Sequence, residues 1–126
     1  MDYKAKFATE TYSPDRLIAG NHHLLIGRQV TILSGQANLK RGSVLGKITS
    51  GGKYVLSLSG SSDGSQVPDL ILAEDCDATS GDKIALAYVR GDFNANALTL
   101  GTAHTVASIT EGLRAKGITL IPAQAA

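Results

Sequence analysis

Two short runs of alternating residues, joined by a glycine-rich turn, constrain this chain more than any other feature. Residues 44–48 alternate apolar side chains with small or charged ones, and residues 54–58 repeat the pattern after the turn at 50–53. Alternation of period two on both sides of a Gly-Gly turn predicts a β-hairpin. Gly42 and Gly46 stand where a strand has to bend or admit another backbone at close range. We therefore expect a kinked, half-buried hairpin at the centre of the fold.

Three further runs are typical of strands. Residues 70–73 are continuously apolar, as expected for a strand that is covered on both faces. Residues 83–89 alternate again, and we expect them to pair with the hairpin before Arg-Gly-Asp at 90–92 makes a turn. Residues 118–121 predict a last strand that Pro122 terminates. Together with the hairpin, these runs predict a mainly β protein.

One short helix is expected near the C-terminus. Ser108 and Glu111 have the spacing of a capping box, in which each side chain satisfies the backbone N–H of the other residue. Ile109 and Leu113 lie one turn apart on a single face. Gly117 suits the left-handed residue that ends a helix. The expected fold class is thus mainly β, a single domain with one short C-terminal helix.

The length of 126 residues is most simply one domain, and it is large enough to bury a core without a disulfide or a structural metal. The single Cys76 excludes an internal disulfide and fits maturation in a reducing compartment. No stretch has the apolar length of a signal peptide or of a membrane span. We expect a soluble protein that is made in the cytoplasm and has no membrane partner.

The charge balance argues against a nucleic-acid partner. The net charge is +1, from 12 basic and 11 acidic residues, and the basic residues are scattered in ones and twos between Lys4 and Lys116. A nucleic-acid-binding surface gathers Lys and Arg into a stripe that neutralises phosphates. Only 18% of the chain is charged and 14 residues are glycine, which favours a turn-rich β protein whose surface is covered by another subunit.

The first residues predict an extended arm. Residues 1–16 are polar, with mixed charge and no sustained period, and Pro14 favours an extended chain. Short apolar runs follow, interrupted by Asn-His-His at 21–23, and they are too brief for stable helices. We place the boundary so that residues 1–29 form the arm and residues 30–126 form the β-rich core.

A Gly-x-Ser-x-Gly sequence at 60–64 matches the nucleophile elbow of hydrolases, and Asp75 and His104 follow it in hydrolase order. That elbow needs a strand before it and a helix after it, and residues 65–68 (Ser-Gln-Val-Pro) do not start a helix. The stretch is better explained as a flexible surface loop. A hydrolase with Ser62 as its nucleophile is the least favoured function.

Two other segments approach cation-binding or phosphate-binding loops and fail on spacing. The acidic segment 75–82 has Ser80 where a calcium loop needs glycine, and Leu86 where it needs a bidentate glutamate. The segment 42–48 is one residue short of a P-loop and has Ile48 where serine or threonine must hold magnesium. We interpret the first segment as an acidic turn and the second as a strand.

Histidines and an adhesion-like tripeptide complete the candidates. His22 and His23 are adjacent, so on an extended chain they point in opposite directions, and His104 is the only other histidine. Arg-Gly-Asp at 90–92 is also a cell-adhesion sequence, but in a cytoplasmic chain a turn after a strand explains it. We therefore predict no catalytic residue, no metal site, no cofactor and no small-molecule substrate.

Four segments together resemble the lambda-like bacteriophage head decoration protein D family. They are residues 41–47 (RGSVLGK), 71–75 (ILAED), 88–94 (YVRGDFN) and 113–118 (LRAKGI). The similarity extends in the right order from about Leu17 to Ile118, so it covers most of the chain.

The resemblance implies a β-clip-like fold and a homotrimer that attaches to the major capsid protein of an expanded phage head. The implied position is the outer capsid surface of the virion, at local three-fold sites, where family members stabilise the shell against the pressure of packaged DNA and do no chemistry. The arm of the family pairs with capsid-protein strands. The residues of this chain that the resemblance implies as capsid-binding are Tyr12, Pro14, Leu17, Ile18 and Gly20.

Without the resemblance, the residues leave other functions open. A sugar-binding or peptide-binding β module and a tail-associated virion subunit fit the same composition and turn-rich pattern. Self-association alone does not separate these from a decoration protein, whereas binding to mature shells does.

Overall fold

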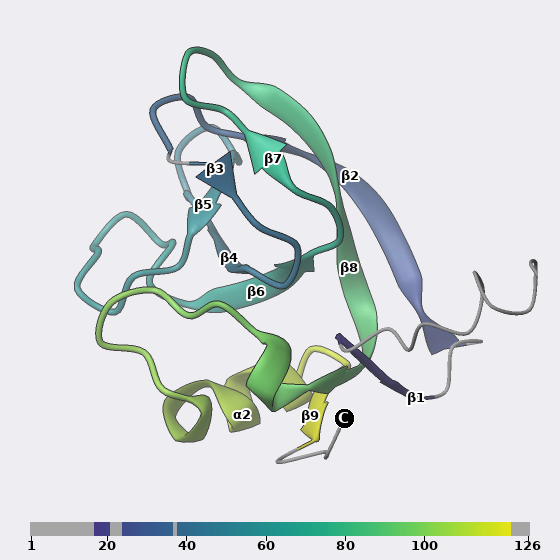
Figure 1. Ribbon diagram of the computed structural model, residues 1–126. Coiled ribbons are helices and arrows are strands. Elements are labelled where there is room, and N and C mark those ends of the chain that lie inside the picture. Colours follow the sequence, from purple (N-terminus) through teal and green to yellow (C-terminus); the bar gives the residue numbers. More distant parts are fainter. Residues whose placement is uncertain (1–16, 21–23, 37, 122–126) are drawn as a thin grey trace, which may run out of the picture.

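The computed structural model describes residues 17–20, 24–36 and 38–121 (Figure 1). The predicted mainly β fold with one short helix near the C-terminus is confirmed, and the closer assignment to a β-clip stays a prediction. The elements, labelled as in Figure 1, are the strands β1 (Ile18–Gly20), β2 (Ile26–Ile32), β3 (Asn38–Leu39), β4 (Val44–Lys47), β5 (Tyr54–Leu56), β6 (Pro68–Leu72), β7 (Cys76–Asp77), β8 (Lys83–Asn94) and β9 (Ile118–Ile121), the 3-10 helix η2 (Ala95–Ala97) and the α-helix α2 (Val106–Arg114).

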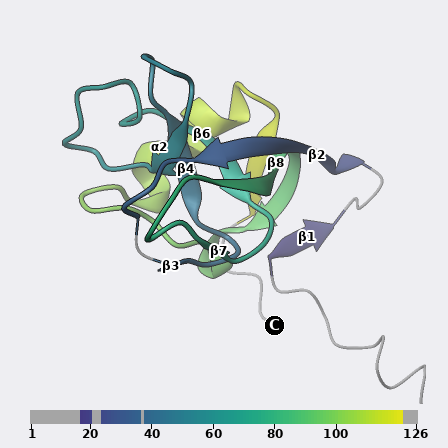
Figure 2. The same ribbon diagram turned by 90° about the horizontal axis from the view of Figure 1, so that it is seen from above.

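Five of the strands close into a small barrel. Their order is β8, β2, β5, β4 and β6, and β6 pairs back with β8. β2 and β5 are parallel where Ile32 lies opposite Tyr54, and the other neighbours are antiparallel. Figure 2 shows β2 and β8 side by side along one wall. Because the sheet closes on itself, these strands leave few free edges.

The predicted hairpin is confirmed. β4 and β5 are antiparallel, with Leu45 opposite Leu56. The close approach expected at Gly46 is also confirmed, because a β-carbon there would lie 2.0 Å from the carbonyl oxygen of Ser65. The sequence led us to expect that the run at 83–89 pairs with the hairpin, and this prediction is wrong. The run pairs with β2 and β6, because these two strands already occupy the outer edges of β5 and β4.

β8 is longer than predicted and continues through the segment expected to turn. Residues 90–92 lie inside the strand, with Phe93 opposite Ile18 of β1 and Gly91 opposite Ile118 of β9. Neighbours on both edges hold the Arg-Gly-Asp segment extended, so tertiary pairing overrides its local preference for a turn. The turn predicted at 90–92 is therefore wrong.

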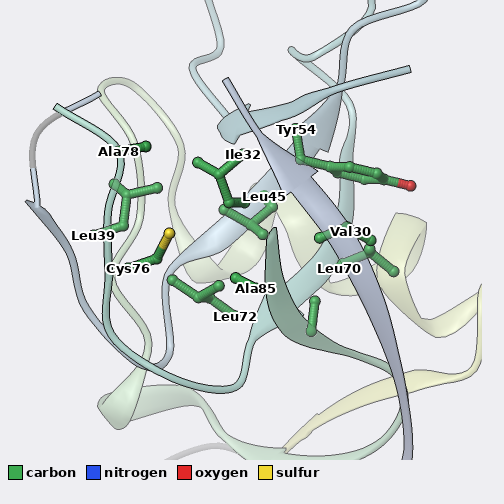
Figure 3. Close-up of a cluster of buried hydrophobic side chains, with 11 residues drawn as sticks. Val30, Ile32, Leu39, Leu45, Tyr54, Leu70, Leu72, Cys76, Ala78 and Ala85 are labelled. Carbon is green, nitrogen blue, oxygen red and sulfur yellow. The ribbon is translucent and has the colours of Figure 1, made fainter. Parts of the chain in front are cut away.

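The buried side chains form two clusters on opposite sides of the barrel wall. The outer cluster lies between the wall and the elements β1, α2 and β9. Leu70 and Leu72 of β6 belong to the inner cluster and Ile71 to the outer one, which confirms that this strand is covered on both faces. The inner cluster fills the barrel (Figure 3) and comprises Val30, Ile32, Leu39, Leu45, Tyr54, Leu70, Leu72, Cys76, Ala78, Ala85 and Ala87.

α2 confirms the predicted helix but not its cap. Thr105 is the N-cap: its side chain accepts from the N–H of Ser108 at 3.1 Å, and the side chain of Ser108 accepts from the N–H of Thr105 at 2.9 Å. The capping box therefore starts three residues earlier than predicted, and Ser108 is its second member instead of its first. Ile109 and Leu113 are buried on one face, as expected. Gly117 has the predicted left-handed conformation, with φ 95°.

Candidate functional site

β1 is the place where the predicted arm joins the fold. The N–H of Asn94 donates to the carbonyl of Leu17 at 2.8 Å, and Ile18 lies opposite Phe93 in the antiparallel pair of β1 and β8. Leu17 is 3% exposed and Ile18 is 7% exposed, and both belong to the outer cluster. Among the strands described, β1 pairs with β8 alone. Backbone pairing and burial together hold this segment at the edge of the sheet.

The structure brings together three of the five residues implied as capsid-binding. Leu17, Ile18 and Gly20 lie in or beside β1, whereas Tyr12 and Pro14 fall outside the described residues. The side chains of Leu17 and Ile18 pack into the outer cluster of their own chain, so in this conformation they stabilise the fold. Contact of these five residues with a capsid stays a prediction.

The last part of the predicted arm lies in the barrel wall. β2 (Ile26–Ile32) pairs with β8 along its whole length. The sequence boundary after residue 29 therefore falls inside a strand, and the division into arm and core stays a prediction. His22 and His23 lie outside the described residues.

The segment that resembles a nucleophile elbow is a surface loop, as predicted, but it is fastened to the barrel. Ser65 is fully buried and donates to the carboxylate of Asp63 from both its N–H, at 3.0 Å, and its hydroxyl. The N–H of Thr49 donates to the carbonyl of Asp63 at 2.9 Å. The hydrogen bonds from Ser65 hold the pKa of the Asp63 carboxyl below its ordinary value. The next element is a strand, β6, so the helix that an elbow requires does not follow.

A serine–histidine contact that the sequence did not predict fastens the same loop. Ser57 is fully buried, its hydroxyl donates to the carbonyl of Ser65 at 2.7 Å, and its Oγ lies 3.2 Å from Nε2 of His104. The same Nε2 lies 3.1 Å from the carbonyl oxygen of Gln66, which can only accept. Nε2 of His104 therefore donates to both Ser57 Oγ and the carbonyl oxygen of Gln66. Ser57 and His104 thus hold the loop in place and do not act as a nucleophile and its general base. Ser57 and His104 are 47 residues apart, so no local pattern connects them.

The acidic segment 75–82 is a turn only in its second half, because Cys76–Asp77 form β7 and pair with β3, where a turn was predicted. Its aspartates accept hydrogen bonds from backbone N–H groups. Asp75 accepts from the N–H of Arg41 at 2.8 Å, and Asp77 accepts from the N–H of Thr79 at 3.1 Å. Hydrogen bonds from Thr79 lower the pKa of the Asp77 carboxyl. Cys76 between them is buried, and this burial raises the pKa of its thiol. Within the described part of the chain, no three His, Cys, Asp or Glu side chains gather into a possible metal site.

The described residues thus form a closed β-barrel with a second apolar layer and with an edge strand where the N-terminal segment enters. Their polar side chains fasten loops to one another. Over the same residues, no helix combines the length and the apolar character that crossing a membrane requires. These features define the class of the protein as a small β-barrel domain.

The family model of the bacteriophage lambda head decoration protein D matches residues 7–121, and the chain belongs to this family. The match covers nearly the whole chain and confirms the resemblance that rested on four short segments. A comparison with curated proteins finds no match. The chain is accordingly a structural protein of the phage virion that decorates the surface of the capsid.

Proposed function

We propose that this chain binds as a homotrimer to the major capsid protein on the outer surface of an expanded phage head. It occupies local three-fold positions and stabilises the head against internal DNA pressure. Membership of the head decoration family is the observation that carries the proposal. Synthesis in the host cytoplasm agrees with the free, buried thiol of Cys76.

The part of the predicted arm that precedes β1 supplies the attachment. β1 stands at the edge of the sheet, so an extended chain that leads into it is directed along a strand. Such a chain adds a strand to an exposed edge of the capsid protein, and main-chain hydrogen bonds then give affinity with little demand on side-chain identity. Tyr12 and Pro14 contact the shell in this proposal. Residues 17–20 hold the base of the arm against β8.

Three arms on one trimer bind as a linked set. Once one arm is engaged, the other two are held near their sites, which raises avidity by about 10²- to 10⁴-fold over a single arm. Weak strand pairing thereby becomes a durable attachment that joins neighbouring capsid subunits. This function requires no catalytic residue, cofactor, nucleic acid or small-molecule substrate.

Binding to expanded and unexpanded heads tests this function. Heads that lack a decoration protein are purified in both forms and mixed with the full chain, and the bound chain is measured in the pellet after sedimentation. We expect saturable binding to expanded heads only, and a higher disruption temperature for the occupied heads. Equal binding to both forms, or binding to neither, contradicts the proposal.

A further inference from the structure

The loop between β5 and β6 carries the only Asp-Gly pair of the sequence, Asp63-Gly64. An aspartate that precedes glycine is prone to isomerise, because glycine has no side chain to hinder attack of its nitrogen on the neighbouring carboxyl group. Asp63 is exposed, so water has access to it. The pair therefore has the chemistry for a covalent rearrangement of the backbone.

The rearrangement takes two steps. In the first, the backbone nitrogen of Gly64 attacks the carbon of the protonated Asp63 carboxyl group, a C–N bond forms, and the proton of the nitrogen leaves with the carboxyl hydroxyl as water. In the second, water adds to the main-chain carbonyl carbon of the five-membered ring, and the bond from that carbon to nitrogen breaks. The product is isoaspartate, in which the backbone runs through the side chain and is longer by one methylene group. The two steps together change no atom count.

Both reacting groups are held by hydrogen bonds in the folded chain. The N–H of Gly64, the attacking group, donates to Oε1 of Gln66 at 2.9 Å. The carboxylate of Asp63 accepts from the hydroxyl of Ser65 and from its N–H, the latter at 3.0 Å. The same bonds lower the pKa of the Asp63 carboxyl, so little of the protonated form that cyclises is present at neutral pH.

The peptide unit between the two residues is also held in place. Ring closure has to turn this unit so that the nitrogen of Gly64 approaches the side chain of Asp63. The carbonyl of Asp63 accepts from the N–H of Thr49 at 2.9 Å, and a β-carbon at Gly64 would lie 3.0 Å from the carbonyl oxygen of Lys47. The loop therefore has to leave Lys47 and Thr49 before the ring can close.

We propose that Asp63-Gly64 is an isomerisation site that the folded loop protects, and that isoaspartate forms only when the loop opens. The rate in the folded chain is then the rate in an open chain multiplied by the fraction of time that the loop is open. His104 holds the same loop, so it controls the reaction without contacting the pair. The reaction also destroys its own protection, because the carbonyl that accepts from Thr49 becomes a free carboxylate. This inference is independent of the proposed function.

A comparison of the folded chain with a synthetic peptide of residues 58–68 tests the inference. Both are incubated at neutral pH and the same temperature, and isoaspartate at position 63 is measured over time by peptide mapping with mass spectrometry. We expect the peptide to isomerise at least about 10-fold faster than the folded chain, and the chain unfolded in urea to behave as the peptide does. Equal rates in the folded chain and the peptide, or a peptide that does not isomerise, overturn the inference.

His104→Ala tests control by loop opening, and Ser61→Ala in the same loop is its control. Loss of the His104 hydrogen bonds is expected to raise the rate of isomerisation by about 5-fold or more, whereas Ser61→Ala keeps the rate of the wild type. Hydrogen exchange of the Gly64 N–H measures opening of the loop in the same samples. We expect the two rates to rise by the same factor in each protein. A rate of isomerisation that does not follow the rate of exchange overturns the inference.

Discussion

Ser57 Oγ lies 3.2 Å from Nε2 of His104, and this contact joins the loop after β5 to the loop before α2. The same Nε2 faces the carbonyl oxygen of Gln66 at 3.1 Å, so one imidazole fastens two points of the first loop. Both loops line a cleft of about 470 Å³, with Leu58, Gly60 and Ser61 in the first loop and Thr102 and Ala103 in the second. The shape of this cleft therefore depends on a contact between residues that are distant in the sequence.

His104→Ala is expected to lower the free energy of unfolding by about 1–2 kcal/mol, because the buried hydroxyl of Ser57 and the carbonyl of Gln66 lose a donor. Urea denaturation of the free protein measures the change. His104→Gln keeps an N–H donor and is expected to recover part of the loss. Unchanged stability of His104→Ala contradicts the assignment of this side chain as a clamp.

Leu17→Ala is expected to lower the free energy of unfolding by about 2–4 kcal/mol, because Leu17 is 3% exposed and belongs to the outer cluster. The loss appears in the free protein, without any shell. A chain of residues 17–126 retains Leu17 and serves as the control, with stability near that of the full chain. If Leu17→Ala keeps full stability and loses only binding to heads, Leu17 acts as a contact residue and not as the base of the arm.

Gly46→Ala is expected to destabilise the protein by about 3 kcal/mol, because its β-carbon would lie 2.0 Å from the carbonyl oxygen of Ser65 and would separate β4 from the loop. Gly60→Ala is the matched control, since nothing lies within 4 Å of a β-carbon at that position. Thermal unfolding of the two variants separates steric contact from the general effect of replacing a glycine. Equal midpoints contradict the close packing of the loop on β4.

Asp82→Asn tests the acid sensitivity of the fold. The carboxylate of Asp82 accepts hydrogen bonds from the ammonium group of Lys53 and from the N–H of Ser34. These hydrogen bonds lower the pKa of Asp82 below its ordinary value of 3.8, and the bond from Lys53 has the larger effect. Because the folded pKa lies below the unfolded pKa, the stabilisation is present above the unfolded value and is lost as the pH falls through the folded value. Wild type should thus exceed Asp82→Asn in stability at pH 7. The difference should begin to shrink as the pH falls below about 4 and should vanish once the pH lies below the folded pKa.

Urea midpoints of wild type and Asp82→Asn at a series of pH values give this difference directly. Asp63 and Asp77 also have lowered pKa values, and they are present in both proteins, so their contributions cancel. A difference in stability that stays constant down to pH 2 contradicts the account.

Elements whose stability is local could be predicted from the sequence. The hairpin of β4 and β5 has its own turn and alternation, and the buried face of α2 follows from the spacing of Ile109 and Leu113. The prediction failed at 90–92, where residues that favour a turn are held extended by β1 and β9. Those partners come from opposite ends of the chain, so no local pattern reports them.

The cap of α2 shows a second limit of local patterns. Thr105 and Ser108 both carry a hydroxyl group at a suitable spacing, and the choice between them depends on which residue leaves the helical conformation. Thr105 is extended, with φ −129° and ψ 164°, so it is the cap. The preceding turn, closed by the N–H of His104 and the carbonyl of Gly101 at 3.1 Å, delivers the chain in that conformation.

Sequence reasoning could single out the N-terminal segment but not how its side chains are used in the fold. The sequence indicated a distinct N-terminal segment, and the structure joins it to the sheet at β1. The apolar character of Leu17 and Ile18 suits either a contact with a partner or burial in the same chain. Only the outer cluster, assembled from several distant elements, shows that these side chains are buried here.

Co-sedimentation of residues 17–126 with expanded heads, compared with the full chain, tests the central claim most directly. The truncated chain keeps every described strand, so we expect it to remain folded and trimeric. A chain that lacks residues 123–126 is the control for removal of terminal residues. The account predicts that the full chain and the control pellet with the heads while residues 17–126 stay in the supernatant. Binding of residues 17–126 at the occupancy of the full chain would contradict it.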